Sequence, residues 1–109
     1  SGSPVLATYR EVLTLLKVAK DKDKIIAAIC LAPMILAKAG VIWRKKVTVF
    51  PTTESLAAIQ EAEANYIETD VVIDGKIITG NGPDAAKEFG KRILEKLKLL
   101  LHHQLVILI

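Results

Sequence analysis

The stretch KIIAAICLAPMILAKAG, residues 24–40, decides the fold of this 109-residue chain. Its five continuous apolar residues, Ile25 to Ile29, are typical of a strand buried on both faces of a parallel sheet. After Cys30, Pro33 suits the first turn of a helix and Gly40 suits its C-terminal cap. The sequence therefore predicts a strand, a turn and a helix, with the only cysteine of the chain at the turn.

The other segments alternate between helical and strand patterns. Apolar residues at three- and four-residue spacing predict a helix over 5–20, and β-branched residues predict a second parallel strand over 46–50. Further helices are predicted over 53–62 and 83–97, and Asp74-Gly75 predicts a two-residue hairpin turn. This alternation predicts an α/β layered fold with a small antiparallel hairpin. The strands are too few for a complete doubly wound sheet, so we expect the fold to be incomplete at its N-terminus.

The C-terminal stretch LLLHHQLVILI, residues 99–109, has no charged side chain and no clear helical period. We expect one domain over residues 1–98, followed by this tail as an irregular extension that packs on a neighbouring surface. The alternative is a partner-binding or sheet-edge strand, because LVILI is apolar and β-prone.

Composition and charge argue against several classes of protein. The chain is 51% hydrophobic and 25% charged, which predicts a folded protein. The net charge of +3 is spread along the chain and aromatic residues make up only 5%, so no nucleic-acid partner is predicted. No apolar stretch reaches the ~20 residues of a membrane span, and the start shows no secretory signal. With a single cysteine and hence no internal disulfide, we expect a cytoplasmic protein without a membrane partner.

Cys30 is the residue with the clearest chemical potential. A thiol is nucleophilic as the thiolate, which a helix N-terminus favours through its unpaired N–H groups and dipole. A cysteine between a buried strand and a helix lies on a turn like a nucleophile elbow. The alternative, a small buried hydrophobic residue, is equally compatible with position alone.

Two segments, IAAICLAPMILAKAGVIWRKKVTVFP and DVVIDGKIITGNGPDAAKEFGKRILEKL, resemble the ThiJ/PfpI superfamily. This superfamily includes intracellular proteases of the PfpI type, glyoxalase III-type enzymes and the Parkinson-disease-associated deglycase. The resemblance extends over roughly residues 1–97. It implies a flavodoxin-like three-layer sandwich, similar to that of class I glutamine amidotransferases, of which this chain is the C-terminal part.

The resemblance also implies a set of site residues. Cys30 corresponds to the reactive cysteine on the elbow. The opening SGSP resembles the family's glycine-rich turn, so Gly2 and Ser3 are expected to line the pocket and to help form an oxyanion hole. Further expected positions are Leu31 within the pocket and three residues at its border, Phe50, Gly82 and Pro83.

Three departures from the family pattern concern acid and base groups. Leu31 stands where PfpI-type members have His after the cysteine, and Phe50 stands where deglycase-like members have His before a proline. The glutamate that stabilises the thiolate in the family lies upstream of the glycine turn, and this chain starts at that turn. General acid and base catalysis is typically worth ~10²- to 10⁴-fold, so we expect the isolated chain to be weakly active or inactive.

The predicted function is that of a cysteine hydrolase, an intracellular protease, or a glyoxalase- or deglycase-type enzyme. Its Cys30 would attack a carbonyl group of a small molecule or peptide, with no cofactor. The alternative is a catalytically silent chain that self-associates as a homo-oligomer, or that needs a partner carrying the missing half.

Other site classes have weaker support. The class I glutamine amidotransferase elbow has glycines where this chain has Ala28 and Ala32, and no late His precedes a Pro and Glu. His102 and His103 are adjacent and diverge on either a helix or a strand, so no metal site is predicted. The segment GNGPDAAKEF lacks the lysine of a phosphate-binding P-loop.

Overall fold

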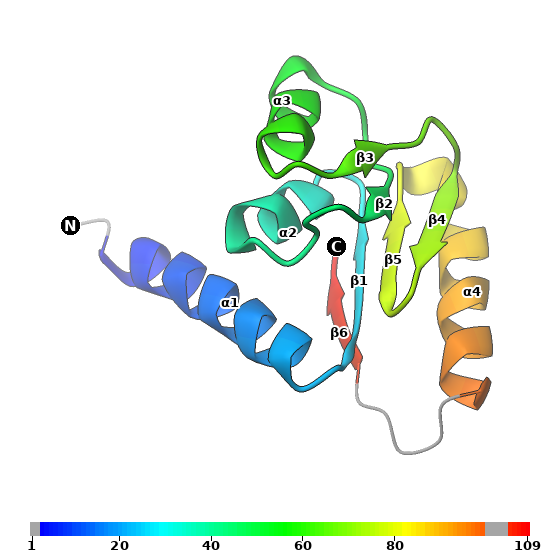
Figure 1. Cartoon of the computed structure of the whole chain (residues 1–109), viewed down its shortest axis with the longest axis horizontal. Helices are drawn as coiled ribbons and strands as arrows, with labels where there is room; N and C mark the ends of the chain where they lie inside the picture. The colour runs from blue at the N-terminus through cyan, green and yellow to red at the C-terminus, as the bar shows by residue number, and fades with distance from the viewer. Residues whose placement is uncertain (1–2, 100–104) are drawn as a thin grey trace.

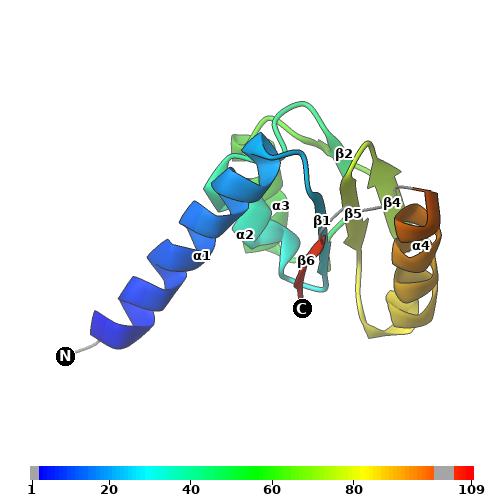
Figure 2. The same ribbon diagram turned by 90° about the horizontal axis from the view of Figure 1, so that it is seen from below.

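The computed structural model describes residues 3–99 and 105–109, with side chains from Tyr9 onward. Helices lie on both sides of a central mixed sheet (Figure 1, Figure 2). The predicted α/β layered fold is therefore confirmed. The elements in chain order are α1 (Ser3–Asp21), β1 (Ile25–Ile29), α2 (Pro33–Ala39), β2 (Lys46–Val47), α3 (Thr53–Glu61), β3 (Asn65–Tyr66), β4 (Val71–Asp74), β5 (Ile77–Gly80), the 3-10 turn η1 (Pro83–Ala85), α4 (Ala86–Leu99) and β6 (Leu105–Leu108).

The central sheet has the strand order β4-β5-β1-β6. Strand β1 runs parallel to β5 on one side and to β6 on the other, while β4 and β5 form an antiparallel hairpin. All five residues of β1 are buried, as the apolar run predicts for a central strand of a parallel sheet. The strand that leads into Cys30 is thus held on both edges.

Alternate residues of β1 face two separate apolar clusters, because side chains alternate along a strand. Ile26 and Ala28 pack in the cluster formed with α1 and α2, which includes Leu16 and Leu36. Ile25, Ala27 and Ile29 pack in the cluster on the other face, against Phe89 and Ile93 of α4. Burial of each large apolar side chain stabilises the fold by about 1.5–3 kcal/mol. The sheet is therefore the middle of three layers.

The two predicted turns, at Gly40 and in the hairpin, lie at or within one residue of their predicted positions. Gly40 caps α2 in the left-handed conformation with φ 74°. Its N–H donates to the carbonyl of Ala37 in the last turn of that helix. In the hairpin, Asp74 pairs with Ile77, so the two-residue turn is Gly75-Lys76, one residue later than predicted. The shift places Gly75, with φ 61°, at the first turn position, where a primed turn requires a positive φ.

The predicted strand over 46–50 is wrong in length and in partner. Only Lys46–Val47 is a strand, and it pairs in parallel with β3 in a separate two-stranded sheet. The N–H of Thr48 donates instead to the side-chain Oγ1 of Thr79 at 2.9 Å, and the N–H of Phe50 donates to the carbonyl of Cys30 at 2.8 Å. Because these two N–H groups do not pair with a neighbouring strand, β2 ends at Val47. The segment after β2 is instead bonded to Cys30 through Phe50.

The expectation of an irregular tail is wrong for Leu105–Leu108, which form the edge strand β6. Val106 and Leu108 pack against the cluster of α1 and α2, whereas Leu105 packs against that of α4. This alternation buries apolar surface on both faces of the sheet, and it confirms the alternative of a sheet-edge strand. Leu99 is the last residue of α4, and residues 100–104, with both histidines, lie outside the described residues.

Candidate functional site

Cys30 lies directly after β1 in a strained backbone conformation. Its φ is 65°, in the left-handed region, which costs a residue with a Cβ atom roughly 1–2 kcal/mol. Two hydrogen bonds hold it there: the N–H of Cys30 donates to the carbonyl of Gly80 at 3.0 Å, and the carbonyl of Cys30 accepts from the N–H of Phe50 at 2.8 Å. The cysteine is thus fixed at a sharp turn from strand to helix, the geometry of a nucleophile elbow.

The thiol of Cys30 is half-buried and free of any disulfide. Within the described part of the chain, its sulfur takes part in no hydrogen bond or ion pair. The side chain is therefore accessible, and no described acid or base group holds its proton.

The backbone after Cys30 leaves one amide available beside the thiol. The N–H of Ala32 donates to Ile29 and that of Met34 donates to Leu31, while Pro33 has no N–H. The N–H of Leu31 makes no hydrogen bond to a described residue. The residue after the nucleophile is the one whose N–H commonly serves an oxyanion hole. The sequence predicts unpaired N–H groups at the start of this helix. In the structure, the N–H of Leu31 is the one of residues 31–34 that is available.

Three border residues predicted from the sequence gather at this edge of the sheet. A Cβ atom on Gly82 would lie 3.3 Å from Cδ1 of Phe50, so these two residues are in close contact. Pro83 follows Gly82 and begins η1. The side chain of Phe50 is 45% exposed, and its carbonyl accepts a 2.7 Å hydrogen bond from the Ser55 hydroxyl. Phe50 is thereby anchored through its backbone with its ring at the surface.

Of the two residues predicted at the glycine-rich turn, the structure describes only the backbone of Ser3. Gly2 lies outside the described residues, and Ser3 is the first residue of α1. Helix α1 leads into the amino end of β1, whereas Cys30 follows its carboxyl end. In both views the N-terminal end of α1 extends away from the sheet (Figure 1, Figure 2). Their role in an oxyanion hole remains a prediction.

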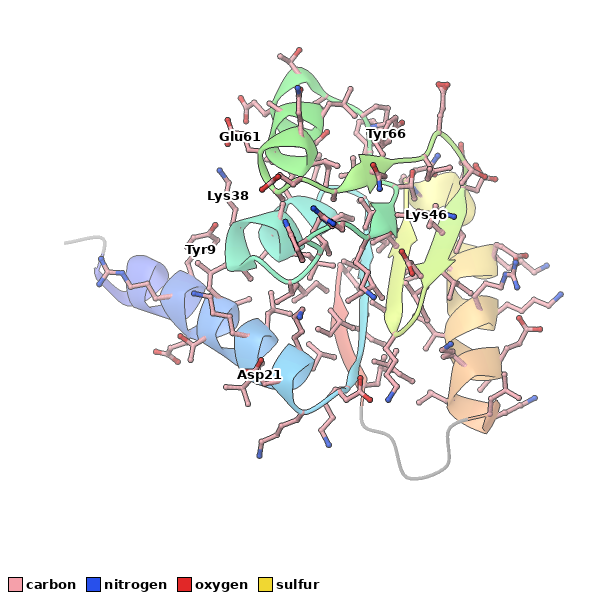
Figure 3. All side chains as sticks on the ribbon, in the orientation of Figure 1. Tyr9, Asp21, Lys38, Lys46, Glu61 and Tyr66 are labelled. Carbon is pink, nitrogen blue, oxygen red and sulfur yellow. The ribbon has the colours of Figure 1, made fainter. Side chains whose placement is uncertain are left out.

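An apolar cavity of about 320 Å³, which the sequence did not indicate, lies beside the elbow. Leu31, 47% exposed, contributes to its wall. Tyr9 of α1 and Lys38 of α2, labelled in Figure 3, also line it and are its polar side chains. From its spacing to other apolar residues, Tyr9 is predicted only to lie on the apolar face of a helix. Ile109 reaches the cavity because β6 pairs with β1. Local sequence patterns therefore could not reveal this cavity. The remaining lining residues are Ala32, Met34 and Ile35.

The side chains of the described residues give no support to two kinds of site, a metal centre and a membrane span. They contain no group of three or more His, Cys, Asp or Glu side chains that could hold a metal ion. None of the helices described here is both long and apolar enough to cross a bilayer.

Comparison with known proteins places these features in context. Residues 1–96 match the sequence model of the DJ-1/PfpI family. An uncharacterised protein of Methanocaldococcus jannaschii is 39% identical over 88 residues, which are 81% of this chain and 43% of that protein. The protein dj-1beta of Drosophila melanogaster is 37% identical, over 88% of this chain and 50% of its own. A glutathione-independent glyoxalase of Caenorhabditis elegans is 32% identical, over 89% of this chain and 50% of its own.

Solved structures superpose on most of this chain. A ThiJ/PfpI domain protein from Brachyspira murdochii superposes with a TM-score of 0.76 and 29% identity, over 82% of this chain and 50% of that one. A putative protease I from Bacteroides thetaiotaomicron superposes with a TM-score of 0.71 over 89% and 57%, and its 22% identity supports the fold alone. The chain spans about half the length of the curated relatives that it matches.

Proposed function

Because the chain belongs to the DJ-1/PfpI family, we propose that Cys30 is a nucleophile that attacks the carbonyl carbon of a small substrate. Membership confirms the resemblance to the ThiJ/PfpI superfamily that the sequence predicted. The single observation that carries the proposal is the left-handed conformation of Cys30, maintained by its bonds to Gly80 and Phe50. Strain of this kind persists where neighbouring structure imposes it, and it clusters at active sites.

The first chemical step follows from this geometry. The thiol gives its proton to water or to a base, and the sulfur then forms a bond to the carbonyl carbon. The π electrons of the C=O bond move to oxygen, and the N–H of Leu31 donates a hydrogen bond to that oxyanion. With an aldehyde, the oxyanion then takes up a proton from water to give a thiohemiacetal, and with an amide it is the tetrahedral intermediate.

The cavity that follows the elbow, lined by Leu31 and Ala32 but not by Cys30 itself, is proposed as the binding place of a small substrate. Its volume of about 320 Å³ lies at the lower end of the range of small-molecule pockets, ~300–1,000 Å³. One relative is named a glutathione-independent glyoxalase, which also supports a small-molecule substrate. We therefore propose a 2-oxoaldehyde such as methylglyoxal as the first substrate to test, with hydrolysis of a small amide as the second.

Turnover by this chain alone is proposed to be weak. Leu31 and Phe50 carry no acid or base group, and the chain spans about half the length of its relatives. The chain thus offers the proposed nucleophile and an oxyanion donor. No described acid or base group stands at these two positions to transfer a proton. A partner that supplies such a group would raise the rate.

The decisive experiment is the rate at which iodoacetamide alkylates Cys30 near neutral pH, followed by intact mass. We expect alkylation at least several-fold faster than that of glutathione under the same conditions, because the proposal gives Cys30 the role of a nucleophile. A rate no faster than glutathione would contradict an activated nucleophile. Consumption of methylglyoxal is then compared between the unaltered chain, Cys30→Ser and the matched surface variant Glu61→Gln. If methylglyoxal consumption is lost in Cys30→Ser and retained in Glu61→Gln, the turnover is assigned to the thiol.

A second proposed property, self-association, has its own observation. Strand β6 is an edge strand of four apolar residues without a charged side chain, and Ile107 is 44% exposed. Charges and prolines are the usual devices that prevent edge pairing, and Leu105–Leu108 contain neither. We propose that two copies pair through β6, so light scattering at tens of micromolar should give the mass of a dimer. A mass of one chain would contradict this, and Ile107→Lys should shift a dimer toward monomer.

A further inference from the structure

A second pocket lies at the amino end of β1, at the opposite end of that strand from Cys30. Four lysines from separate segments line it: Lys20 near the end of α1, Lys24 before β1, Lys45 before β2 and Lys76 in the hairpin turn. The pocket has a volume of about 140 Å³. The tertiary fold therefore gathers positive charge that is dispersed in the sequence.

One carboxylate, that of Asp23, lines the same pocket. It pairs with Lys76, whose Nζ lies 2.6 Å from Oδ2 of Asp23 and also donates to the Asp23 carbonyl at 3.0 Å. Lys20, Lys24 and Lys45 form no ion pair with any described residue. The nearby carboxylate of Asp74 accepts from the backbone N–H of Lys46, and it does not line the pocket. A net excess of positive charge thus remains.

The frame of this pocket is fixed by buried and hydrogen-bonded backbone. Its inner wall consists of Ile26, Val41 and Ile77, all at most 5% exposed. The N–H of Ile26 donates to the carbonyl of Lys76 at 2.8 Å, and that of Lys24 donates to Ala19 at 2.9 Å. The low-polarity wall strengthens the field of the ammonium groups, since electrostatic interactions grow as the local dielectric constant falls.

We propose that this pocket binds a phosphate group. Lysines bind phosphate as point charges, and several converging from different segments would surround its oxygens. The volume of about 140 Å³ has room for one phosphate group. Ile26 in the pocket wall precedes Cys30 by four residues, about 13 Å at ~3.3 Å per residue, and Cys30 does not line the pocket, so this site is separate from the thiol.

The test is an NMR titration of the ¹⁵N-labelled full chain with inorganic phosphate at constant ionic strength. We expect saturable shifts at the amides of residues 20–24, 45 and 76, and no comparable shifts with chloride. The double variant Lys24→Gln/Lys45→Gln should bind about tenfold more weakly per lysine removed. The matched control Lys87→Gln/Lys91→Gln removes two exposed charges from α4 and should bind as the unaltered chain does. Equal weakening in both double variants, or equal shifts with chloride, would overturn the proposal.

A glycerol phosphate titration distinguishes the sources of the group. Binding of both probes assigns the site to a phosphate ester, binding of inorganic phosphate alone assigns it to the free ion, and binding of neither overturns the site. Acetylation footprinting of the unaltered chain avoids any dependence on variant folding. Phosphate should protect Lys20, Lys24 and Lys45 relative to Lys87 and Lys91, and uniform labelling would count against the pocket.

Discussion

Replacement of Thr79 by valine should destabilise the protein even though valine has nearly the same shape and is more apolar. Thr79 is fully buried, and its Oγ1 accepts the N–H of Thr48, also fully buried, at 2.9 Å. Valine leaves that N–H without an acceptor, and a stranded buried donor costs about 1–3 kcal/mol. The hydrophobic gain from exchanging a hydroxyl for a methyl group at a packed position does not offset this cost.

Thr79→Ser is the matched control, because it keeps the hydroxyl and removes one methyl group. Loss of a buried methyl group costs roughly 1 kcal/mol. The expected order of the free energy of unfolding is therefore threonine, then serine, then valine, measured by urea denaturation with unchanged slopes. Hydrogen exchange at the Phe50 amide should also rise in Thr79→Val, since the Thr48 bond anchors the segment that reaches Cys30. A valine variant at least as stable as the serine variant would refute the reasoning.

Three further changes test the elbow and its supports. Cys30→Gly should be more stable than Cys30→Ala by about 1 kcal/mol, because glycine adopts φ 65° without strain, and thermal denaturation of the two variants measures the difference. Ser55→Ala should cost about 1–2 kcal/mol in urea denaturation, because Ser55 completes the capping box of α3 and donates to the Phe50 carbonyl; an unchanged midpoint would contradict this. Gly80→Ala should cost about 1–3 kcal/mol, because its Cβ would lie 3.1 Å from Phe89, and calorimetry should show a lower melting temperature.

Local signals predicted the central unit of the fold correctly. The apolar run of β1, Pro33 and Gly40 each act within a few residues of their own position, so the strand, the elbow and α2 could be predicted. The hairpin was also predicted, with an error of one residue in its turn. The position of Cys30 at the turn follows from the same local signals, whereas its left-handed φ depends on bonds to Gly80 and Phe50.

Features that depend on distant partners could not be predicted in this way. The strand at residues 46–50 ends early because the hydroxyl of Thr79, 31 residues away, takes the N–H of Thr48. Strand β6 exists through its pairing with β1, which no pattern within the tail specifies. The lysine pocket likewise joins segments that are dispersed in sequence. In each case a tertiary contact overrides or creates local structure.

The position of β1 has a consequence for how the chain folds. Its two neighbouring strands come much later in the sequence, and Ile25 pairs with Leu105 about 80 residues further on. Both pairings of the segment IIAAI are therefore of long range in sequence, and contacts of this kind form slowly during folding. The elbow at Cys30 takes its bond to Gly80 from the hairpin, and its strand takes its second neighbour from β6. The contacts that complete the elbow and its strand thus come from segments about 50 and about 80 residues further along the sequence.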